Sequence, residues 1–523
     1  MQKRNGYLLL TVFISGMTTL GVELSASRLL DPFFGNSLVI WAAIIGLMLL
    51  YLTVGYFIGG RWADKDPRLS TLFQITAWGA FLVGLIPFVA APVLRWSVHG
   101  MAQFDGGILA SSLIGVLVLF SVPITLLGTV SPFAIRLALD DVHRGGRVAG
   151  SVYAVSTVGS LVGTFLPVLI LIPNIGTRLT FFTFAVILLA VSLGGLLLIR
   201  PKRALIYATM LLVLVGLNLL WPAGPIKPIP GMVYEAESRY NYIQVADYID
   251  GQGAQWRLLY LNEGEGVHSA YSPNHNDFPL VDGVWDYFLV VPYFNNPPFA
   301  EADVGSLLVI GSAAGTISKA YSDIYGPIPI DGVEIDPGII EVGREWFGMN
   351  EPNLAVHAQD GRFFLANTDK TYDVIAVDAY RPPYIPFHLT TQEFFQEISA
   401  HLNEDGVVAI NAGRSATDYS LVEALGTTMK SVFPNVYVFD VPDYGSTLGN
   451  SLVIATKQPT RLENFEFNVV QLQQPLLRVV AQRALGARMW EFEPGPDDLI
   501  FTDDKAPVEQ VIHRLIFRYL LGG

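Results

Sequence analysis

The segment LLVIGSAAGTISKAY, residues 307–321, joins an apolar run, a turn of small residues and a stretch with helix-forming character. This pattern predicts a β-strand, a tight turn and an α-helix. The turn, Gly311-Ser-Ala-Ala-Gly315-Thr, contains no acidic residue. Because its residues have small side chains or none, a ligand can approach the backbone closely there. The segment therefore predicts a turn that holds a nucleotide or a nucleoside.

Strands and helices alternate from about residue 305 onward. The five predicted strands are SLLVIG (306–311), PIDGVEID (329–336), LAVHAQD (354–360), DVIAVDA (373–379) and GVVAINAG (406–413). Between them lie four helical stretches, ISKAYSDIY, GIIEVGREWF, RFFLANT and TQEFFQEISAHL. This alternation predicts a Rossmann-like α/β domain, with a parallel, doubly wound sheet and helices on both faces. In such sheets, ligands bind beyond the carboxyl ends of the strands.

Acidic residues follow the second and third predicted strands. Glu334 and Asp336 end the second strand, where a carboxylate can accept both hydroxyls of a ribose. Asp360 and Gly361 follow the third strand, in a position to contact the edge of an adenine. Together with the small-residue turn, these residues predict that an adenosine-type ligand binds at this edge of the sheet.

The fourth strand ends at Asp378, just before the aromatic, proline-rich loop AYRPPYIPFHL. Asp378 is a candidate catalytic residue, and the alternative is that it caps the turn that follows. The turn between Gly311 and Gly315 is not followed by the Gly-Lys-Ser/Thr of a phosphate-binding loop. A nucleoside such as S-adenosylmethionine therefore suits the site better than a triphosphate.

The first 222 residues form a predicted transmembrane helical domain. A membrane span needs about 20 mainly apolar residues. Seven segments meet this requirement, at about 7–30, 38–59, 71–94, 107–131, 150–172, 178–199 and 203–221. We therefore expect a multi-pass protein of the cell membrane, with the lipid bilayer as its partner.

Basic residues indicate how these spans are oriented. They occur at the N-terminus and in every second loop, whereas the loops between hold only Arg95 and Arg178. The positive-inside rule then places the N-terminus in the cytoplasm. With seven spans, the domain that follows lies outside, and one span more or fewer would reverse this result.

Charge changes sign along the chain. Residues 1–222 contain 14 Lys and Arg against 7 Asp and Glu, whereas the remainder contains 18 against 39. The acidic part would repel phosphates, so we expect no nucleic-acid partner. Cysteine is absent, which excludes disulfides and thiolate chemistry. The histidines lack the spacing of metal ligands, and we expect no metal site.

The acidic part begins with a linker and a β-rich subdomain. The linker contains PAGPIKPIPG, and the runs YNYIQVADYI and WRLLYLNEG have the aromatic and branched residues typical of strands. We therefore expect three parts: a membrane domain at 1–222, a linker with a β-rich subdomain at 223–300, and the Rossmann-like domain at 301–523.

The order of these motifs resembles the spermidine synthase family of aminopropyltransferases. The β-rich lead-in, the small-residue turn, VEID, QDG, the aspartate before the proline-rich loop, and LTT before a helix all lie within about residues 234–460. The segments ELSASRLLDPFFGNSLVIW, GYFIGGRWAD, GTVSPFAIRLAL and FTDDKAPVE (501–509) are similar to members of the family that are fused to a membrane domain. The resemblance implies a membrane-anchored transferase.

The resemblance also implies roles for individual residues. Enzymes of this family transfer the aminopropyl group of decarboxylated S-adenosylmethionine to an amine. By position, Asp378 would be the base that takes the proton of the amine, Glu334 would bind the ribose and Asp360 the adenine. Asn241 stands where the family usually has a glutamine that contacts the nucleoside. By the same resemblance, we expect a homodimer.

Three features depart from the pattern of the family. Ala314 stands where an aspartate binds the aminopropyl nitrogen, and Arg381 stands where a second aspartate binds the substrate. A Tyr-His-Glu segment that helps to hold the diamine is represented by Asp286-Tyr287-Phe288. The loss of two carboxylates and the gain of a guanidinium make a dicationic amine a poor match and favour a neutral or anionic acceptor.

Five residues are the candidates for binding this small-molecule acceptor: His268, Asp286, Tyr287, Tyr380 and Arg381. Arg381 could instead form a structural salt bridge, and Tyr380 could simply pack in its loop. Two other functions stay open. One is a methyltransferase or lyase that uses S-adenosylmethionine, and the other is a membrane transporter or scaffold with a non-catalytic synthase-like domain.

Overall fold

The computed structural model describes most of the chain in two compact units. The described residues are 2–34, 38–101, 107–139, 142–220, 225–251, 253–262, 266–274, 280–380, 384–442, 448–495 and 498–520. The first unit comprises Met1–Pro230 with Glu235–Tyr242, and the second comprises Gly231–Tyr234 with Ile243–Gly523.

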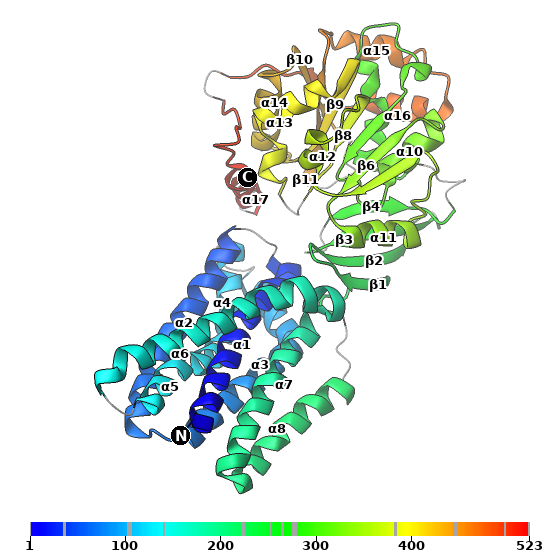
Figure 1. The fold of residues 1–523 in the computed structure, drawn as a ribbon. Helices are drawn as coiled ribbons and strands as arrows, with labels where there is room; N and C mark the ends of the chain where they lie inside the picture. Colours follow the sequence, from blue (N-terminus) through cyan, green and yellow to red (C-terminus); the bar gives the residue numbers. More distant parts are fainter. Residues whose placement is uncertain are drawn as a thin grey trace. The chain divides into compact units, whose positions relative to one another are not determined.

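The first unit is built from helices (Figure 1). They form because a helix satisfies its backbone hydrogen bonds internally, which an apolar environment requires. The α-helices are α1 (Gln2–Phe34), α2 (Leu38–Lys65), α3 (Leu69–Met101), α4 (Gly107–Gly128), α5 (Val130–Ala138), α6 (Gly145–Leu166), α7 (Ile172–Ile199) and α8 (Pro201–Leu220). The short helical turns are η1 (Val142–Arg144) and η2 (Pro167–Leu171).

Six helical segments within the described residues are long and apolar enough to cross a membrane. One of them runs for 55 residues, from Gly145 to Ile199, and contains both predicted spans 150–172 and 178–199. A straight helix of this length would measure about 80 Å, whereas the hydrocarbon core of a bilayer is about 30 Å thick. Gly176 interrupts the helical backbone of this run, with φ 77° and ψ 165°. The structure has six such segments and the sequence predicted seven spans, because the run from Gly145 to Ile199 counts once in the structure and twice in the prediction.

A four-stranded sheet follows, in the order β1 (Met232–Glu237), β2 (Tyr242–Ile249), β3 (Gln255–Leu261) and β4 (Val267–Tyr271). It contains the two runs that the sequence predicted to be strands. The strands β2, β3 and β4 pair antiparallel. Alternate residues of β2 and β3 pack against α11 (Pro337–Trp346), because side chains in a strand point to opposite faces in turn.

The main sheet has eight strands, in the order β12-β10-β11-β9-β8-β5-β6-β7. The five predicted strands are confirmed as β5 (Leu307–Ile310), β6 (Ile330–Glu334), β7 (Leu354–Ala358), β8 (Tyr372–Val377) and β9 (Leu402–Ser415), which pair parallel. Three further strands add antiparallel at one edge, β10 (Asn435–Asp440), β11 (Leu448–Thr456) and β12 (Met489–Glu491). The purely parallel sheet that the sequence predicted is therefore extended by an antiparallel part.

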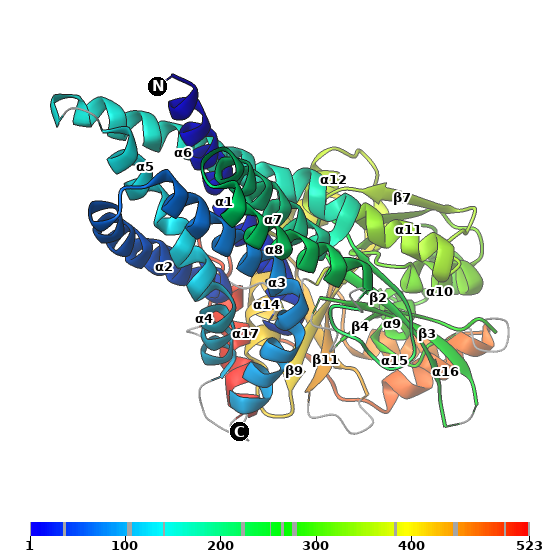
Figure 2. The same cartoon turned by 90° about the horizontal axis from the view of Figure 1, so that it is seen from below.

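Helices cover both faces of this sheet, as predicted (Figures 1 and 2). One apolar core lies against α12 (Gly361–Ala366), α13 (Gln392–Ala400), α14 (Ser420–Lys430) and α17 (Val508–Leu520). The other lies against η3 (Phe288–Phe294), α10 (Thr316–Tyr325), α15 (Glu463–Val469) and α16 (Pro475–Leu485). The remaining short elements are α9 (Val284–Tyr287), η4 (Glu301–Asp303) and η5 (Phe387–Leu389).

Candidate active site

The turn after β5 lies directly against the end of β8. Gly311 has φ 84°, and a Cβ atom there would lie 2.5 Å from the carbonyl oxygen of Asp378. Only glycine fits this close approach together with a left-handed backbone. Gly315, also left-handed with φ 89°, begins α10. The conformation of the turn therefore depends on its two glycines, and the turn lies beside Asp378, the candidate catalytic residue.

Glu334 joins this turn to the end of β6. Its Oε2 accepts a hydrogen bond from the backbone N–H of Ala313 (3.0 Å), and its Oε1 accepts one from Asp336 N–H (3.0 Å). Burial raises the pKa of Glu334 to about 7. Each of its oxygens keeps a second lone pair, so the carboxylate can still accept hydrogen bonds from a ligand.

Asp336 has a structural partner of its own. It is fully buried, and its side chain accepts a hydrogen bond from Gly338 N–H (2.9 Å), which makes it the N-cap of α11. An aspartate in this position satisfies a backbone N–H that the first turn of a helix leaves unpaired. Its predicted role in nucleoside binding stays a prediction.

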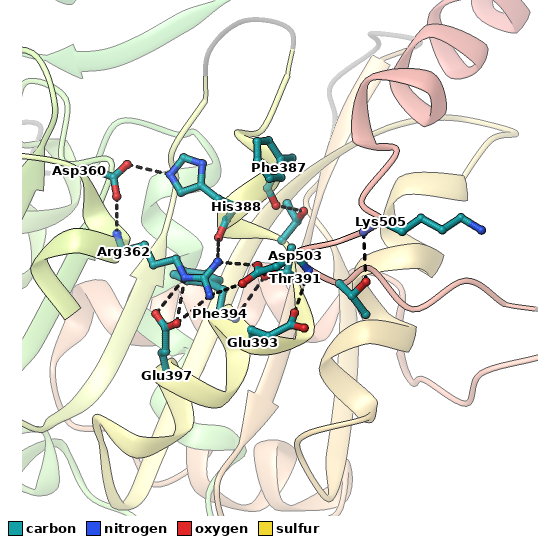
Figure 3. Close-up of polar contacts among 12 residues, drawn as sticks. Asp360, Arg362, Phe387, His388, Thr391, Glu393, Phe394, Glu397, Asp503 and Lys505 are labelled. Carbon is teal, nitrogen blue, oxygen red and sulfur yellow. Dashed lines mark hydrogen bonds and ion pairs between the residues drawn. The ribbon is translucent and has the colours of Figure 1, made fainter. Parts of the chain in front are cut away.

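Asp360 caps α12 at the end of β7. Its Oδ1 accepts hydrogen bonds from the N–H groups of Arg362 and Phe363 (both 3.0 Å), and its Oδ2 lies 2.8 Å from His388 Nε2. The hydrogen bond with His388 is the main reason why the pKa of Asp360 is lowered. Gly361 packs against β5, since a Cβ atom there would lie 2.3 Å from Ile310 Cγ2. Figure 3 shows the side chain of His388 reaching Asp360.

Asp378, at the end of β8, is held by two side chains that the sequence did not predict. Its Oδ2 accepts a hydrogen bond from Trp285 Nε1 (3.0 Å), and its Oδ1 accepts one from Asn411 Nδ2 (2.9 Å). Desolvation raises the pKa of Asp378, and the two donors partly offset this rise. The turn that Asp378 would cap in the alternative interpretation runs into residues 381–383, which lie outside the described residues, so this alternative stays open.

The hydroxyl of Tyr380 forms hydrogen bonds with two residues of β9. It donates to the carbonyl oxygen of Asn411 (3.1 Å) and accepts from Gly413 N–H (2.9 Å). These bonds fix the tyrosine ring two residues after Asp378. Arg381, the next predicted substrate residue, lies outside the described residues.

Two other predicted substrate residues, Asp286 and Tyr287, lie in or near the apolar core. The buried Asp286 accepts hydrogen bonds from Val281 N–H (3.2 Å) and Asp282 N–H (2.8 Å), and burial raises its pKa to about 6. Tyr287 is buried against Phe439, with ring centroids 5.0 Å apart. The side chains of Asp286 and Tyr287 therefore stabilise the fold, and their contact with a substrate stays a prediction.

His268 lies in β4 of the four-stranded sheet, and Asn241 lies in the turn between β1 and β2. Burial lowers the pKa of His268 to about 4, and its Nε2 has no hydrogen-bond partner within the described part of the chain. Asn241 belongs to the first unit, in a turn where its N–H donates to Ser238 Oγ (2.8 Å). Both stay candidates for ligand binding.

The strand order places three carboxylates at the same end of the main sheet. Since β8, β5, β6 and β7 are neighbours, Asp378, Glu334 and Asp360 all lie at the carboxyl ends of adjacent parallel strands. This is the edge at which doubly wound sheets bind their ligands.

Comparison with known proteins identifies the family. The spermine/spermidine synthase domain matches residues 306–464. A probable polyamine aminopropyl transferase of Bifidobacterium longum is 34% identical over 297 residues, which cover 53% of this chain and 61% of that protein. A polyamine aminopropyltransferase of Vibrio vulnificus is 31% identical over 230 residues, which cover 43% of this chain and 71% of that protein. The chain belongs to the polyamine aminopropyltransferase family.

The predicted resemblance to the spermidine synthase family is thus confirmed for the second unit. The chain spans 61% of the length of the Bifidobacterium aminopropyltransferase. The chain is also similar to a protein named for another activity: an N-terminal histidine N-methyltransferase of Emericella nidulans is 33% identical over 239 residues, which cover 43% of this chain and 42% of that protein.

Ala314 is the clearest departure of this chain from the aminopropyltransferase pattern. Its side chain is buried in an apolar cluster with Ile339, Val342 and Phe347, and its N–H donates to Ser269 Oγ (3.0 Å). An aspartate in this position would bring a charge into that cluster, which is costly. The surroundings of Ala314 therefore suit an apolar side chain.

Proposed function

We propose that the second unit transfers an aminopropyl group from decarboxylated S-adenosylmethionine to an amine. The observation that supports this most strongly is Asp378, a carboxylate at a strand end that is held by two neutral donors, Trp285 and Asn411. These donors orient the carboxylate without neutralising its charge. The group can therefore still accept a proton, as a general base must.

In the proposed reaction, the nitrogen of a neutral amine attacks the carbon bound to the sulfonium. A new C–N bond forms, the C–S bond breaks, and the sulfur keeps the electron pair, which leaves methylthioadenosine. The proton of the amine passes to Asp378. The raised pKa of Asp378 favours this step, because a more basic carboxylate takes the proton more readily.

The nucleoside would lie across the ends of β5, β6 and β7. The remaining lone pairs of Glu334 would accept the ribose hydroxyls, and Asp360 would contact the adenine. Gly311 and Gly315 give the turn its left-handed backbone, with Gly311 packed against the end of β8 and Gly315 against Met349. The described contacts of these residues are compatible with this role, because they fix each carboxylate through neighbouring backbone groups.

The acceptor would carry less positive charge than a diamine. Ala314 provides no carboxylate, and Asp286 is buried, with 2% of its surface exposed. Asp378 would then be the main anionic group that faces the acceptor within the described residues. A small amine with a single basic nitrogen fits this charge better than a dication.

A methyltransferase is the second candidate. The N-terminal histidine N-methyltransferase of Emericella nidulans, at 33% identity, supports this alternative. It would use the same nucleoside site with S-adenosylmethionine, and a methyl group would be transferred in place of the aminopropyl group.

The helices of the first unit would anchor the enzyme in a cell membrane through seven spans. The 55-residue run supports two spans, because it is too long for one and is interrupted at Gly176. With a cytoplasmic N-terminus, the second unit would then lie outside. Protease digestion of sealed vesicles that keep the orientation of the cell membrane tests this topology. Protease added to the medium should cut the second unit. Full protection of that unit would contradict the seven-span count. A homodimer is proposed by family likeness alone.

Isothermal calorimetry on the full chain in detergent tests the proposed enzyme. The ligands are decarboxylated S-adenosylmethionine, S-adenosylmethionine and methylthioadenosine. We expect the decarboxylated form and methylthioadenosine to bind, with S-adenosylmethionine weaker. Preference for S-adenosylmethionine would favour a methyltransferase or lyase. No binding of any of the three would overturn both enzyme proposals and favour a transporter or scaffold.

A further inference from the structure

The segment Phe501–Asp503 lies beyond the residues that match the synthase domain, yet it is built into the second unit. The ring of Phe501 is fully buried in the core beside α13, α14 and α17. Its N–H donates to Thr428 Oγ1 (3.0 Å), and its carbonyl oxygen accepts from Gln392 N–H (2.8 Å). Asp503, two residues later, therefore starts from a fixed backbone.

Asp503 forms a two-point ion pair with Arg362. Its Oδ1 lies 2.6 Å from Nη1 and its Oδ2 lies 2.8 Å from Nη2 of the guanidinium. Figure 3 shows these groups pointing toward each other, with Glu397 on the other side of Arg362. The ion pair lowers the pKa of Asp503, with the Arg362 hydrogen bond as the largest cause. Geometry of this kind is the strong form of the Arg–carboxylate contact.

All five N–H groups of Arg362 have acceptors. Besides Asp503, the guanidinium donates to Glu397 through Nε (3.0 Å) and Nη2 (2.8 Å). Its remaining Nη1 proton goes to the carbonyl oxygen of His388 (3.2 Å). Arg362 thus connects the C-terminal segment to α13 and to the backbone of His388.

These contacts converge on Asp360, the candidate adenine ligand. Arg362 is two residues after Asp360, and its N–H bonds to Asp360 Oδ1. His388 contacts the other oxygen of Asp360 through Nε2 (2.8 Å). Arg362 therefore contacts both residues of the Asp360–His388 pair: its backbone N–H bonds to Asp360, and its guanidinium bonds to the carbonyl oxygen of His388.

Asp503 also secures the end of the loop that follows Asp378. Its Oδ1 accepts from Thr391 Oγ1 (2.7 Å), and its N–H donates to Glu393 Oε2 (3.0 Å). Thr391 is the N-cap of α13. At the other end of the same loop, Tyr384 Oη lies 2.7 Å from Nε2 of His513, on α17. The C-terminal residues thus hold this loop at two points.

We propose that Asp503 is a positioning residue for the nucleoside site: through Arg362 and Thr391 it fixes Asp360 and His388 in the arrangement that binds adenine. The proposal rests on the proposed function, because it assumes that a nucleoside binds at these strand ends. The C-terminal segment would then stabilise the binding site, although Asp503 lies 141 residues from Arg362 in sequence.

Calorimetry on the full chain with methylthioadenosine tests this role. In Asp503→Asn, the two-point ion pair is lost, and we expect the Kd to rise at least about fivefold, as for a weakened charge-assisted contact. The KM for decarboxylated S-adenosylmethionine should rise by a similar factor, with kcat nearly unchanged. Asp504→Asn is the matched control, since it removes the same charge one residue later, where no contact to the site is described.

The outcomes separate this inference from the proposed function. If the unaltered chain binds no nucleoside, the proposed function fails. If it binds and Asp503→Asn binds equally well, only the positioning role fails, even if the melting temperature drops. Should Asp503→Asn not fold, Arg362→Lys replaces it: lysine keeps the charge but cannot hold both carboxylates and the His388 carbonyl. An unchanged Kd in folded Arg362→Lys would equally overturn the proposal.

Discussion

The two sides of the candidate site are held together in different ways. Glu334 and Asp360 accept hydrogen bonds from backbone N–H groups, mostly within three residues in sequence. Within the described residues, the hydrogen bonds to the side chain of Asp378 come from the side chains of Trp285 and Asn411, which are 93 and 33 residues away. Backbone donors persist whatever the side chains are, whereas side-chain donors change with a single substitution. The backbone hydrogen bonds of Glu334 and Asp360 are therefore less sensitive to substitution than the hydrogen bonds of Asp378, although the contact of Asp360 with His388 also depends on a side chain.

The substitution Asp378→Asn should have the largest effect, and this effect should be on the chemical step and not on nucleoside binding. An amide cannot take the proton of the amine, so we expect kcat to fall by about 10²–10⁴-fold. The Kd for methylthioadenosine should stay within about threefold, because the nucleoside side is untouched. Turnover assays and calorimetry on the same preparation check both numbers.

A fall in kcat of less than about tenfold would mean that Asp378 is not the base. An equal loss of nucleoside binding would mean that the two sides of the site are not separate, which would break the comparison.

The substitution Glu334→Gln should affect the other side and spare the chemistry. The neutral amide keeps the shape but loses the charge-assisted hydrogen bonds to the ribose, and one end of it now meets a backbone N–H with a donor. We expect the Kd for methylthioadenosine to rise by about 10- to 100-fold. Glu466→Gln is a suitable control, since Glu466 is exposed on α15 and no contact of Glu466 with the site is described. An unchanged Kd would remove Glu334 from the ribose site.

The smallest effect should come from Trp285→Phe, which removes one donor to Asp378 and keeps an aromatic ring. The Trp285 hydrogen bond lowers the pKa of Asp378, so its loss should raise that pKa further. A base with a higher pKa stays protonated up to a higher pH. The acid limb of the kcat profile should therefore move to higher pH, and kcat at neutral pH should fall by less than about tenfold.

A profile of kcat against pH for the two proteins checks this direction. A shift of the acid limb to lower pH, or no shift at all, would contradict the role given to the indole N–H.

The fold of the second unit could be predicted because its signals are local. Each strand from β5 to β9 is an apolar run with a polar residue at its end, and the helices between them have their own periodicity. The positions of Glu334 and Asp360 at strand ends could be predicted in the same way, and their roles in nucleoside binding stay predictions. Trp285 could not be found in this way, because it meets Asp378 only after the sheet has formed. Asp503 was marked by the segment FTDDKAPVE, but its partner Arg362 was not.

The departures from prediction also have physical reasons. The strands β10, β11 and β12 join antiparallel, and such pairing needs no crossover helix, so the alternation of strands and helices does not announce them. The interruption at Gly176 is a backbone conformation, which hydropathy does not record. Asp286 and Tyr287 are buried and have contacts within the fold that the sequence did not predict, and their contact with a substrate stays a prediction.

The most direct test of the account is a single-turnover assay of the full chain with decarboxylated S-adenosylmethionine and a panel of monoamines and diamines, followed by mass spectrometry. The account predicts equal amounts of methylthioadenosine and aminopropylated amine, with monoamines preferred and product formation about 10²–10⁴-fold slower in Asp378→Asn. Nucleoside binding without any aminopropylated product from the unaltered chain would contradict the proposed transferase.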